Sequence, residues 1–307
     1  MTREILCKLI EEFSDDSPLN FLGVRGALNF DVTENNYAKN NLDPQRITAD
    51  MLGVEKDSGM AGMRFFRHPI FSVGRADDPG FTVIKRPAVV GEHHFLPEDW
   101  LPGARSVISV FLPYERATVE ANKRDPIEPP LEWVCTRVDG QRFLLALGAR
   151  IRDALIADGY RAVTPHVEDR FIINTGGDPA PGTEHVPRFS SNWSERHVAF
   201  VTGLGTFGLS TNFISKVGCA GRLVSVVTDW DVEPDIKDTD DWLGYCNRCG
   251  ECIRNCQGQV YYSDKYGKDH KKCGEFARFA AKKHAPRYGC GKCQTAIPCE
   301  FQPMKAK

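Results

Sequence analysis

Apolar and charged residues alternate with the period of a helix at the start of the chain. The apolar positions are Ile5, Leu6, Leu9, Ile10 and Phe13. Lys8, Glu11 and Glu12 lie between them, so one face of a helix would be buried and the other solvated. The pattern predicts an amphipathic helix and not a signal peptide, which needs an uninterrupted apolar stretch.

Further patterns predict regular structure along the next two hundred residues. Continuous apolar, β-rich runs predict buried strands at 106–112 and 222–228. A helical stripe predicts a helix over 141–158, with Gly159 as its C-cap. Shorter patterns predict a strand within 162–165 and a helix near 194–201.

The remaining segments before residue 235 are rich in turn-forming residues. Their composition predicts a meandering stretch with short helices at 15–103 and a loop at 173–193. An acidic linker at 229–241 precedes a cysteine-rich tail. Strands interspersed with helices predict an α/β or α+β layered domain, followed by a small domain organised by a cofactor.

Composition and charge weaken the case for two kinds of partner. The chain has 307 residues, 41% of them hydrophobic, and a formal net charge of −2. A near-neutral chain gives no electrostatic argument for nucleic acid or for an anionic membrane. Its strongly apolar runs are too short to cross a bilayer. We therefore expect a cytoplasmic protein that binds neither DNA nor tRNA nor membrane.

The distribution of cysteines is the strongest chemical signal. Of eleven cysteines, eight lie between Cys246 and Cys299, while Cys7, Cys135 and Cys219 are scattered. Clustered CxxC spacings inside a large chain favour metal over disulfides, which occur mostly in small secreted domains. The three scattered cysteines fit buried apolar positions better than ligand positions.

The spacing predicts two [4Fe–4S] clusters. The first group reads CxxCxxCxxxC, in which the fourth cysteine ligates the other cluster of a two-cluster ferredoxin. One predicted set is Cys246, Cys249, Cys252 and Cys299, and the other is Cys256, Cys273, Cys290 and Cys293. A helix at 275–284 would lie between Cys273 and the last group. Two structural zinc sites are the chemical alternative, but zinc ribbons use paired CxxC knuckles.

The order of segments resembles epoxyqueuosine reductases and, more distantly, reductive dehalogenases. The resemblance is carried by residues 101–114 (LPGARSVISVFLPY), 141–158, 195–215 (ERHVAFVTGLGTFGLSTNFIS), 222–229 and the eight-cysteine pattern. It implies an α+β fold in which residues 1–235 form a nitroreductase-like, cobalamin-binding domain. Residues 236–307 would form a ferredoxin-like domain with the two clusters.

By the same resemblance, one glycine-rich loop would line the cobalamin. Its residues are Gly203, Gly205, Gly208, Ser210, Thr211 and Asn212. Glycine lets a backbone approach a ligand closely, and Ser, Thr and Asn offer hydrogen bonds. Taken alone, this GxGxxG-like run also fits a dinucleotide fingerprint or a turn without a ligand, although no clear strand precedes it.

Departures from epoxyqueuosine reductases change the expected substrate. The family's proton-donating aspartate falls at Phe189 here, and its aromatic-rich segment is replaced by residues 138–142 (VDGQR). The chain also stops shortly after the cysteines, without the family's C-terminal helical region associated with tRNA. We therefore expect a small-molecule substrate and not tRNA.

With that aspartate replaced, other polar residues become candidates for proton transfer. The catalytic candidates are Tyr114, Asp139, Arg142 and His197. Tyr114 follows the strand at 106–112 at its C-terminal end, a usual place for functional groups in layered proteins. Histidine, tyrosine or a carboxylic acid with a raised pKa commonly donates a proton near neutral pH. For each candidate, a solvated or capping role is the alternative.

Three functional hypotheses follow. In the first, a low-potential donor such as ferredoxin or flavodoxin passes electrons through the clusters to cobalamin, which reduces a small molecule. In the second, the chain is an electron-transfer protein that reduces the corrinoid or flavin of a partner. In the third, the first domain itself binds flavin.

Overall fold

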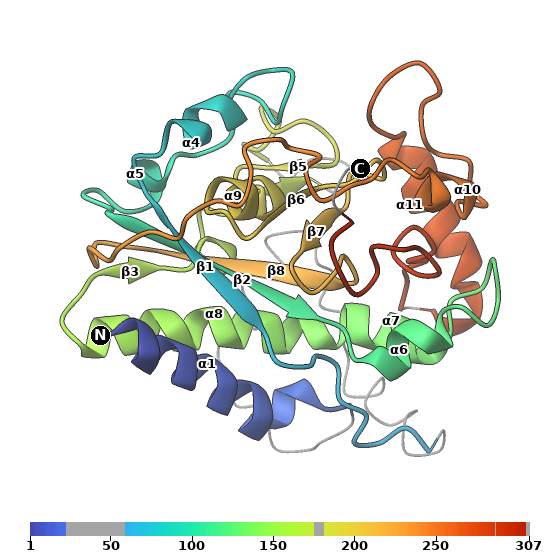
Figure 1. Ribbon diagram of the computed structural model, residues 1–307, viewed down its shortest axis with the longest axis horizontal. Coiled ribbons are helices and arrows are strands. Elements are labelled where there is room, and N and C mark those ends of the chain that lie inside the picture. The colour runs from blue at the N-terminus through green and yellow to red at the C-terminus, as the bar shows by residue number, and fades with distance from the viewer. Residues whose placement is uncertain (23–58, 175–180, 286, 305–307) are drawn as a thin grey trace.

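The computed structural model describes residues 1–22, 59–174, 181–285 and 287–304 (Figure 1). Its helices are α1 (Arg3–Asp16), η1 (Pro18–Asn20), α4 (Pro79–Ile84), α5 (Pro97–Trp100), α6 (Arg116–Ala121), α7 (Leu131–Val138), α8 (Gly140–Ala157), η4 (Pro165–Val167), α9 (Glu195–Val201), α10 (Glu251–Arg254), α11 (His270–Ala280) and η5 (Lys282–His284). Its strands are β1 (Ile70–Arg75), β2 (Ser106–Pro113), β3 (Ala162–Val163), β4 (Ile173–Asn174), β5 (Ser190–Ser191), β6 (Gly205–Phe207), β7 (Phe213–Ser215) and β8 (Gly221–Thr228).

An antiparallel sheet with the strand order β1-β2-β8-β3 forms the centre of the described fold. In β2, Ile108 lies opposite Val73 of β1, and Ser109 lies opposite Ser225 of β8. Every residue of β2 is buried, because helices cover both faces of the sheet. The predicted strands at 106–112, 162–165 and 222–228 are confirmed as β2, β3 and β8, and the fold is α+β.

The edge strand β1 lies in a segment that the sequence predicts to be meandering, so that prediction is wrong at 70–75. Its run IFSVGR is interrupted by a glycine and ends in a charge, which hides the strand pattern. Gly74 is required by packing, since a Cβ there would lie 2.8 Å from the Thr202 Cα at the end of α9. The helices α4 and α5 are the short helices expected in this segment, and its residues 23–58 lie outside the described ones.

Helices α1 and α8 pack on one face of the sheet (Figure 1). Leu6 and Ile10 of α1, and Phe143 and Leu147 of α8, join the strand residues in the main core cluster. Both helices are predicted by the sequence. Ile5 departs from the predicted stripe, because 54% of its surface is exposed.

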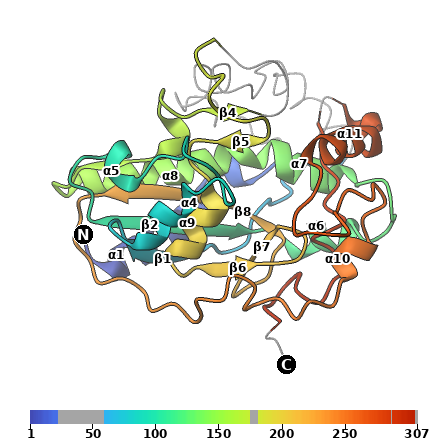
Figure 2. The same cartoon turned by 90° about the horizontal axis from the view of Figure 1, so that it is seen from above.

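Helices α9 and α4 cover the other face (Figure 2). Their core residues include Val198 and Phe81, which join Trp193 and Val107 in a second cluster. The rings of Phe81 and Trp193 are stacked with centroids 6.2 Å apart. The prediction of a helix near 194–201 is confirmed as α9.

Two regions for which the sequence predicts no strand contain short paired strands. The glycine-rich run forms the hairpin β6–β7, in which Phe207 lies opposite Phe213. Strands β4 and β5 pair within 173–193, whose residues 175–180 lie outside the described part of the chain. Strands this short carry too few alternating positions for a sequence pattern to reveal them.

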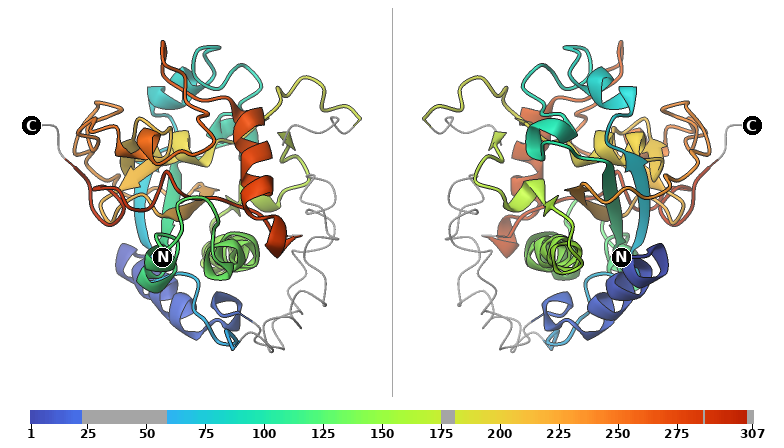
Figure 3. Two further views of the ribbon diagram at one scale, coloured as in Figure 1. Left: turned by 90° about the vertical axis from the view of Figure 1, so that its right-hand side faces the viewer. Right: turned by 90° about the vertical axis from the view of Figure 1, so that its left-hand side faces the viewer.

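The cysteine-rich segment lies at one end of the sheet beside α6 and α7 (Figures 1 and 3). Its helix α11 begins earlier than predicted, at His270 and not 275, because the Asp269 side chain caps it by accepting from the Lys272 N–H at 2.9 Å. The helix ends at Ala280, and Cys273 lies inside its first turn and not before it. The domain boundary at residue 235 stays a prediction.

None of the described helices combines the length and the apolar character that crossing a membrane requires.

Candidate iron–sulfur site

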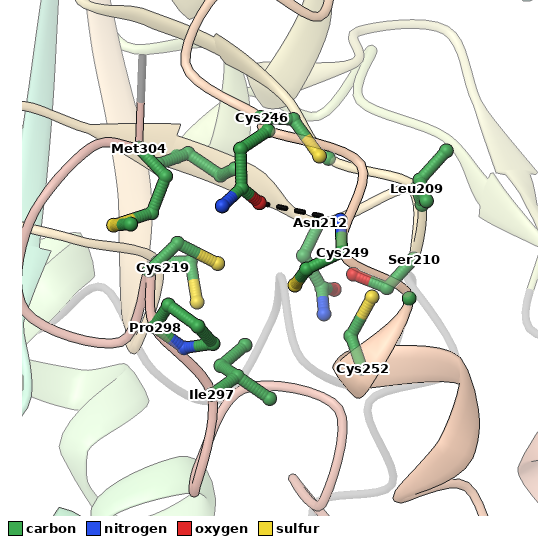
Figure 4. Close-up of a pocket in the computed structure, with 15 residues that line it drawn as sticks. Leu209, Ser210, Asn212, Cys219, Cys246, Cys249, Cys252, Ile297, Pro298 and Met304 are labelled. Carbon is green, nitrogen blue, oxygen red and sulfur yellow. Dashed lines mark hydrogen bonds between the residues drawn. The ribbon is translucent and has the colours of Figure 1, made fainter. Parts of the chain in front are cut away.

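Four of the predicted cluster ligands surround one pocket (Figure 4). Cys246 and Cys249 lie on the loop before α10, Cys252 lies on α10, and Cys299 comes from the C-terminal segment. The structure therefore brings together the set that the spacing assigns to the first cluster. The ligand roles themselves stay a prediction.

Left-handed turns shape the loop that carries the first three cysteines. Arg248 has φ 58° and Gly250 has φ 79°. The Asn247 side chain accepts a hydrogen bond from the Cys249 backbone N–H at 3.2 Å. These turns allow thiols that are three residues apart to face the same pocket, whereas on an extended strand such residues would point to opposite faces.

The other four predicted ligands lie within one another's electrostatic influence. Burial raises the pKa of the Cys273 thiol; Lys268 opposes this shift, and the charges of Cys293 and Cys256 add to it. Burial also raises the pKa of Cys290 to about 12, again with contributions from Cys293 and Cys256. The second predicted set is therefore also a spatial neighbourhood, built from α11 and the two loops on either side of it.

The two sets adjoin each other at Cys252 and Cys293. Burial raises the pKa of Cys252 to about 12, and the charge of Cys293 contributes beside those of Cys299 and Cys246. Two cofactors held by these sets would therefore be neighbours, which short-range electron transfer requires.

A buried cation lies next to the second set. Lys292 is 5% exposed, and its Nζ donates to the Asn122 backbone oxygen at 2.7 Å and to the Asn122 Oδ1 at 2.9 Å. Burial lowers the pKa of Lys292, and the charge of Cys290 opposes that shift. A fixed positive charge here would stabilise thiolates in the second set.

All eleven cysteines are free in the structure. Among the described residues, no three His, Cys, Asp or Glu side chains converge on the position of a single metal ion. The cysteines of the first set instead line the walls of a pocket.

The loop predicted to line cobalamin lies mostly against the cysteines. Gly208, Ser210 and Asn212 form part of the cysteine pocket. Gly205 is enclosed by its own hairpin, since a Cβ there would lie 2.1 Å from the Ile214 carbonyl oxygen. A Cβ on Gly203 would meet Lys237 at 3.1 Å.

Thr211 lies in the turn between β6 and β7 and has φ 61°. Its backbone oxygen accepts a hydrogen bond from the Arg196 guanidinium at 3.1 Å. Three of the six residues thus line the cysteine pocket, and the role of the six in binding cobalamin stays a prediction.

The four catalytic candidates lie in different surroundings. Tyr114 is buried in the core with its ring 4.9 Å from that of Trp133. Asp139 forms a buried, two-bond ion pair with Arg287, at 2.7 and 3.0 Å. The backbone N–H of Arg142 donates to the Asp139 oxygen at the start of α8.

His197 lies on α9, on the other face of the sheet. Its Nδ1 is 2.7 Å from the Ser194 hydroxyl, and burial lowers its pKa to about 4, with a further contribution from Arg196. The imidazole is therefore neutral near pH 7. Of the four candidates, Tyr114 and Asp139 have evident packing roles, and the catalytic assignments stay predictions.

Phe189, which stands at the place of the family's aspartate, contacts the cysteine-rich segment. Its ring stacks on that of His270 of α11 with centroids 6.0 Å apart. Its backbone has φ 62°, a strained conformation for an aromatic residue. An aromatic contact thus joins this loop to α11.

Sequence reasoning missed Cys219 as a member of the site. It is 2% exposed, as predicted for a buried apolar position, but it also lines the cysteine pocket. Its backbone N–H donates to the Cys299 oxygen at 3.0 Å. No spacing rule could reveal this residue, because eighty positions separate it from its neighbour and it belongs to no CxxC pair.

Comparison with known proteins gives matches among solved structures alone. No family model matches the chain, and no curated protein matches it. An epoxyqueuosine reductase matches at 18% identity with a TM-score of 0.44, over 82% of this chain and 64% of that one. The Bacillus subtilis epoxyqueuosine reductase matches at 16% identity with a TM-score of 0.45, over 84% of this chain and 68% of that one.

A catabolic reductive dehalogenase matches at 12% identity with a TM-score of 0.48, over 98% of this chain and 36% of that one. The chain thus spans about a third of the dehalogenase's length. These structural neighbours belong to the two families that the sequence resembles. At these identities and TM-scores, the activity has to be argued from this chain's own residues.

Proposed function

We propose that the chain is an iron–sulfur reductase that holds two [4Fe–4S] clusters in a ferredoxin-like C-terminal part. The pocket lined by Cys246, Cys249, Cys252 and Cys299 carries the proposal. Three ligands from a CxxCxxC run plus one distant cysteine is the arrangement that two-cluster ferredoxins use.

Two observations favour clusters over zinc. Eight cysteines divide into two sets of four with none left over in the run, as the spacing requires. The charge of the fourth cysteine of the run, Cys256, helps to raise the pKa values of both Cys273 and Cys290, which supports its assignment to the second set. A zinc knuckle gives no reason for this exchange of a ligand between the two sets.

The chain's own residues would hold and shield the clusters. Cys246 and Cys252 are each 8% exposed, and Leu243 and Ile297 pack with them in one apolar cluster. Such a lining excludes water and lowers the local dielectric, and both affect reduction potential. Lys292 would offset negative charge at the second set.

The proposed route is from a low-potential protein donor, through the two clusters, to an acceptor that reduces a small molecule. By resemblance the acceptor is a corrinoid bound to a nitroreductase-like N-terminal part, and bound flavin is the alternative. Cobalamin would supply the strongly reducing metal centre. Because Gly208, Ser210 and Asn212 line the cysteine pocket, we assign no residue of this chain to the corrin and derive no step through it.

Metal analysis of protein purified without oxygen from cobalamin-fed cells tests the proposal. We expect about eight iron and about eight sulfide per chain, with little zinc. Zinc in place of iron would contradict it. About one cobalt per chain would identify the acceptor as a corrinoid, and flavin released on denaturation would identify it as flavin.

A second candidate function is an electron-transfer protein that reduces the corrinoid or flavin of a partner. The position of the glycine-rich loop against the cysteines favours it, because that loop then needs no organic cofactor. Iron without cobalt or flavin, together with a reducible cluster signal, would select this function over the reductase.

A further inference from the structure

The segment from β6 to β8 brings three hydrogen-bond donors to the cysteine sulfurs. The Ser210 side chain lines the same pocket as Cys252, and a hydrogen bond from it lowers the pKa of that thiol. The Asn212 Nδ2 donates to the Cys293 Sγ at 3.2 Å. Cys219 lines this pocket beside Cys299, and a hydrogen bond from its thiol lowers the pKa of Cys299. One segment of the large domain therefore contacts ligands of both predicted sets.

Each donor is buried and therefore held in place. Ser210, Asn212 and Cys219 are 3%, 4% and 2% exposed. The turn that carries the first two is closed by the Gly208 N–H, which donates to the Asn212 oxygen at 2.8 Å. In addition, the Tyr266 hydroxyl donates to the Gly208 oxygen at 3.0 Å, which ties the turn to the cysteine-rich segment.

The backbone at Cys219 packs directly against the backbone at Cys299 and Glu300. Its backbone N–H donates to the Cys299 oxygen at 3.0 Å. The preceding Gly218 leaves no room for a side chain, since a Cβ would lie 2.2 Å from the Glu300 oxygen. The Cys219 thiol also lies 3.8 Å from the Gln294 oxygen. An iron-bound Cys299 carries negative charge, which makes its sulfur the better acceptor for the single thiol proton.

A donor aimed at an iron-bound thiolate has a defined electrostatic effect. Reduction adds one electron to a cluster, so a hydrogen bond to its sulfur stabilises the reduced form more than the oxidised form. Hydrogen bonds to the sulfurs and exclusion of solvent are among the factors that set cluster potentials. Removing such a donor should lower the potential of the cluster whose ligand it contacts.

We propose that Ser210, Asn212 and Cys219 are positioning residues that raise the reduction potentials of the two clusters through hydrogen bonds to their ligand sulfurs. Ser210 and Cys219 act on the first set, through Cys252 and Cys299, and Asn212 acts on the second, through Cys293. The inference rests on the proposed clusters. It gives the glycine-rich segment a role in tuning the electron path in place of lining a corrin.

An anaerobic redox titration followed by electron paramagnetic resonance tests the inference. Each cluster gives its own reduction wave. We expect Ser210→Ala and Cys219→Ala to move the same wave to a more negative potential. Asn212→Leu should move the other wave in the same direction. Cys219→Ser keeps a donor and should stay near the wild-type potential, and Cys7→Ala, on the distant helix α1, should change neither wave.

Iron and sulfide content separates failure of this inference from failure of the proposed function. If the wild-type protein contains no iron, the proposed clusters themselves are contradicted. If Ser210→Ala and Asn212→Leu keep their full iron content and neither shifts a reduction potential, the tuning role alone is overturned. The same holds if both variants shift the potential of the same cluster. Loss of iron in Cys219→Ser would overturn the tuning role of Cys219 and indicate that this residue is a cluster ligand. If Cys219→Ala fails to fold, Ser210→Ala, which removes a single oxygen, decides the case for the first set.

Discussion

His94 is a fully buried histidine that the fold keeps neutral. Its Nε2 accepts a hydrogen bond from the Ser194 backbone N–H at 3.0 Å, and its ring stacks on Trp193 with centroids 5.4 Å apart. Burial lowers its pKa to about 3, and the charges of His197 and His93 contribute. Protonation at Nε2 would set a second N–H against that of Ser194 and break the contact.

This burial should make the protein sensitive to acid. The unfolded chain takes up the His94 proton below its ordinary pKa of about 6.5, whereas the folded chain takes it up only near 3. The free energy of unfolding should therefore be at its full value above pH 6.5 and fall as the pH decreases through this window. The contribution of His94 to the slope is at most about 1.4 kcal/mol per pH unit.

Urea unfolding of wild type and His94→Gln between pH 5 and 7 measures this effect. We expect the variant to be less stable at pH 7 but to lose less stability as the pH falls. His68→Gln is the matched control, because the His68 side chain is 64% exposed. Parallel curves for wild type and His94→Gln would show that His94 is not responsible.

At the scale of elements, a buried ion pair joins the α7–α8 junction to the cysteine-rich segment. Asp139 and Arg287 are each 5% exposed. Removing the charge of one partner would leave the other uncompensated in a low-dielectric site. We expect Asp139→Asn to lower the free energy of unfolding by about 3–5 kcal/mol.

Chemical denaturation of the single and double variants measures this cost. The double variant Asp139→Leu/Arg287→Met should recover most of the loss, because it leaves no buried charge. Asp77→Asn breaks the exposed pair with Arg75 and should leave the free energy of unfolding nearly unchanged. A loss confined to activity, with unchanged unfolding, would instead favour the catalytic role that the sequence suggests for Asp139.

The elements that sequence predicts well are those whose packing is decided by long apolar patterns. β2 and β8 are buried on both faces and therefore read as continuous apolar runs, and α1 and α8 have helical stripes. β1 is stabilised by pairing with the distant strand β2 and by the close contact at Gly74, and the β6–β7 hairpin by the close contact at Gly205. Those contacts leave no local pattern.

The sequence likewise predicts some residues of the candidate site and misses others. The cysteine spacing indicates both ligand sets, because each cluster needs thiolates at short, fixed intervals along the chain. Ser210, Asn212 and Cys219 approach the sulfurs only after the two parts of the chain pack together. Their relation to the clusters therefore depends on tertiary structure and could not be predicted from local spacing.

At the scale of the whole molecule, α11 presents positive charge next to a proposed ligand. Lys271, Lys272 and Arg278 are exposed on α11, and Lys282 and Lys283 follow in η5. Glu275 is the single exposed carboxylate between residues 270 and 284, all of which the structure describes. The same helix carries Cys273, so a carrier docked here would lie close to the second set (Figure 3).

We expect an acidic, low-potential electron carrier to use this surface. Exposed charges at the edge of an interface act mainly on the association rate and on its dependence on salt. Lys271→Glu should therefore slow cluster reduction by an acidic ferredoxin in stopped-flow measurements at low ionic strength, and added salt should reduce the difference.

Lys8→Glu on α1 is the matched control, since the Lys8 side chain is 75% exposed. Dithionite, which needs no docking surface, should reduce all three proteins at similar rates. Equal rates with the ferredoxin for Lys271→Glu and wild type would place the entry point for electrons elsewhere on the molecule.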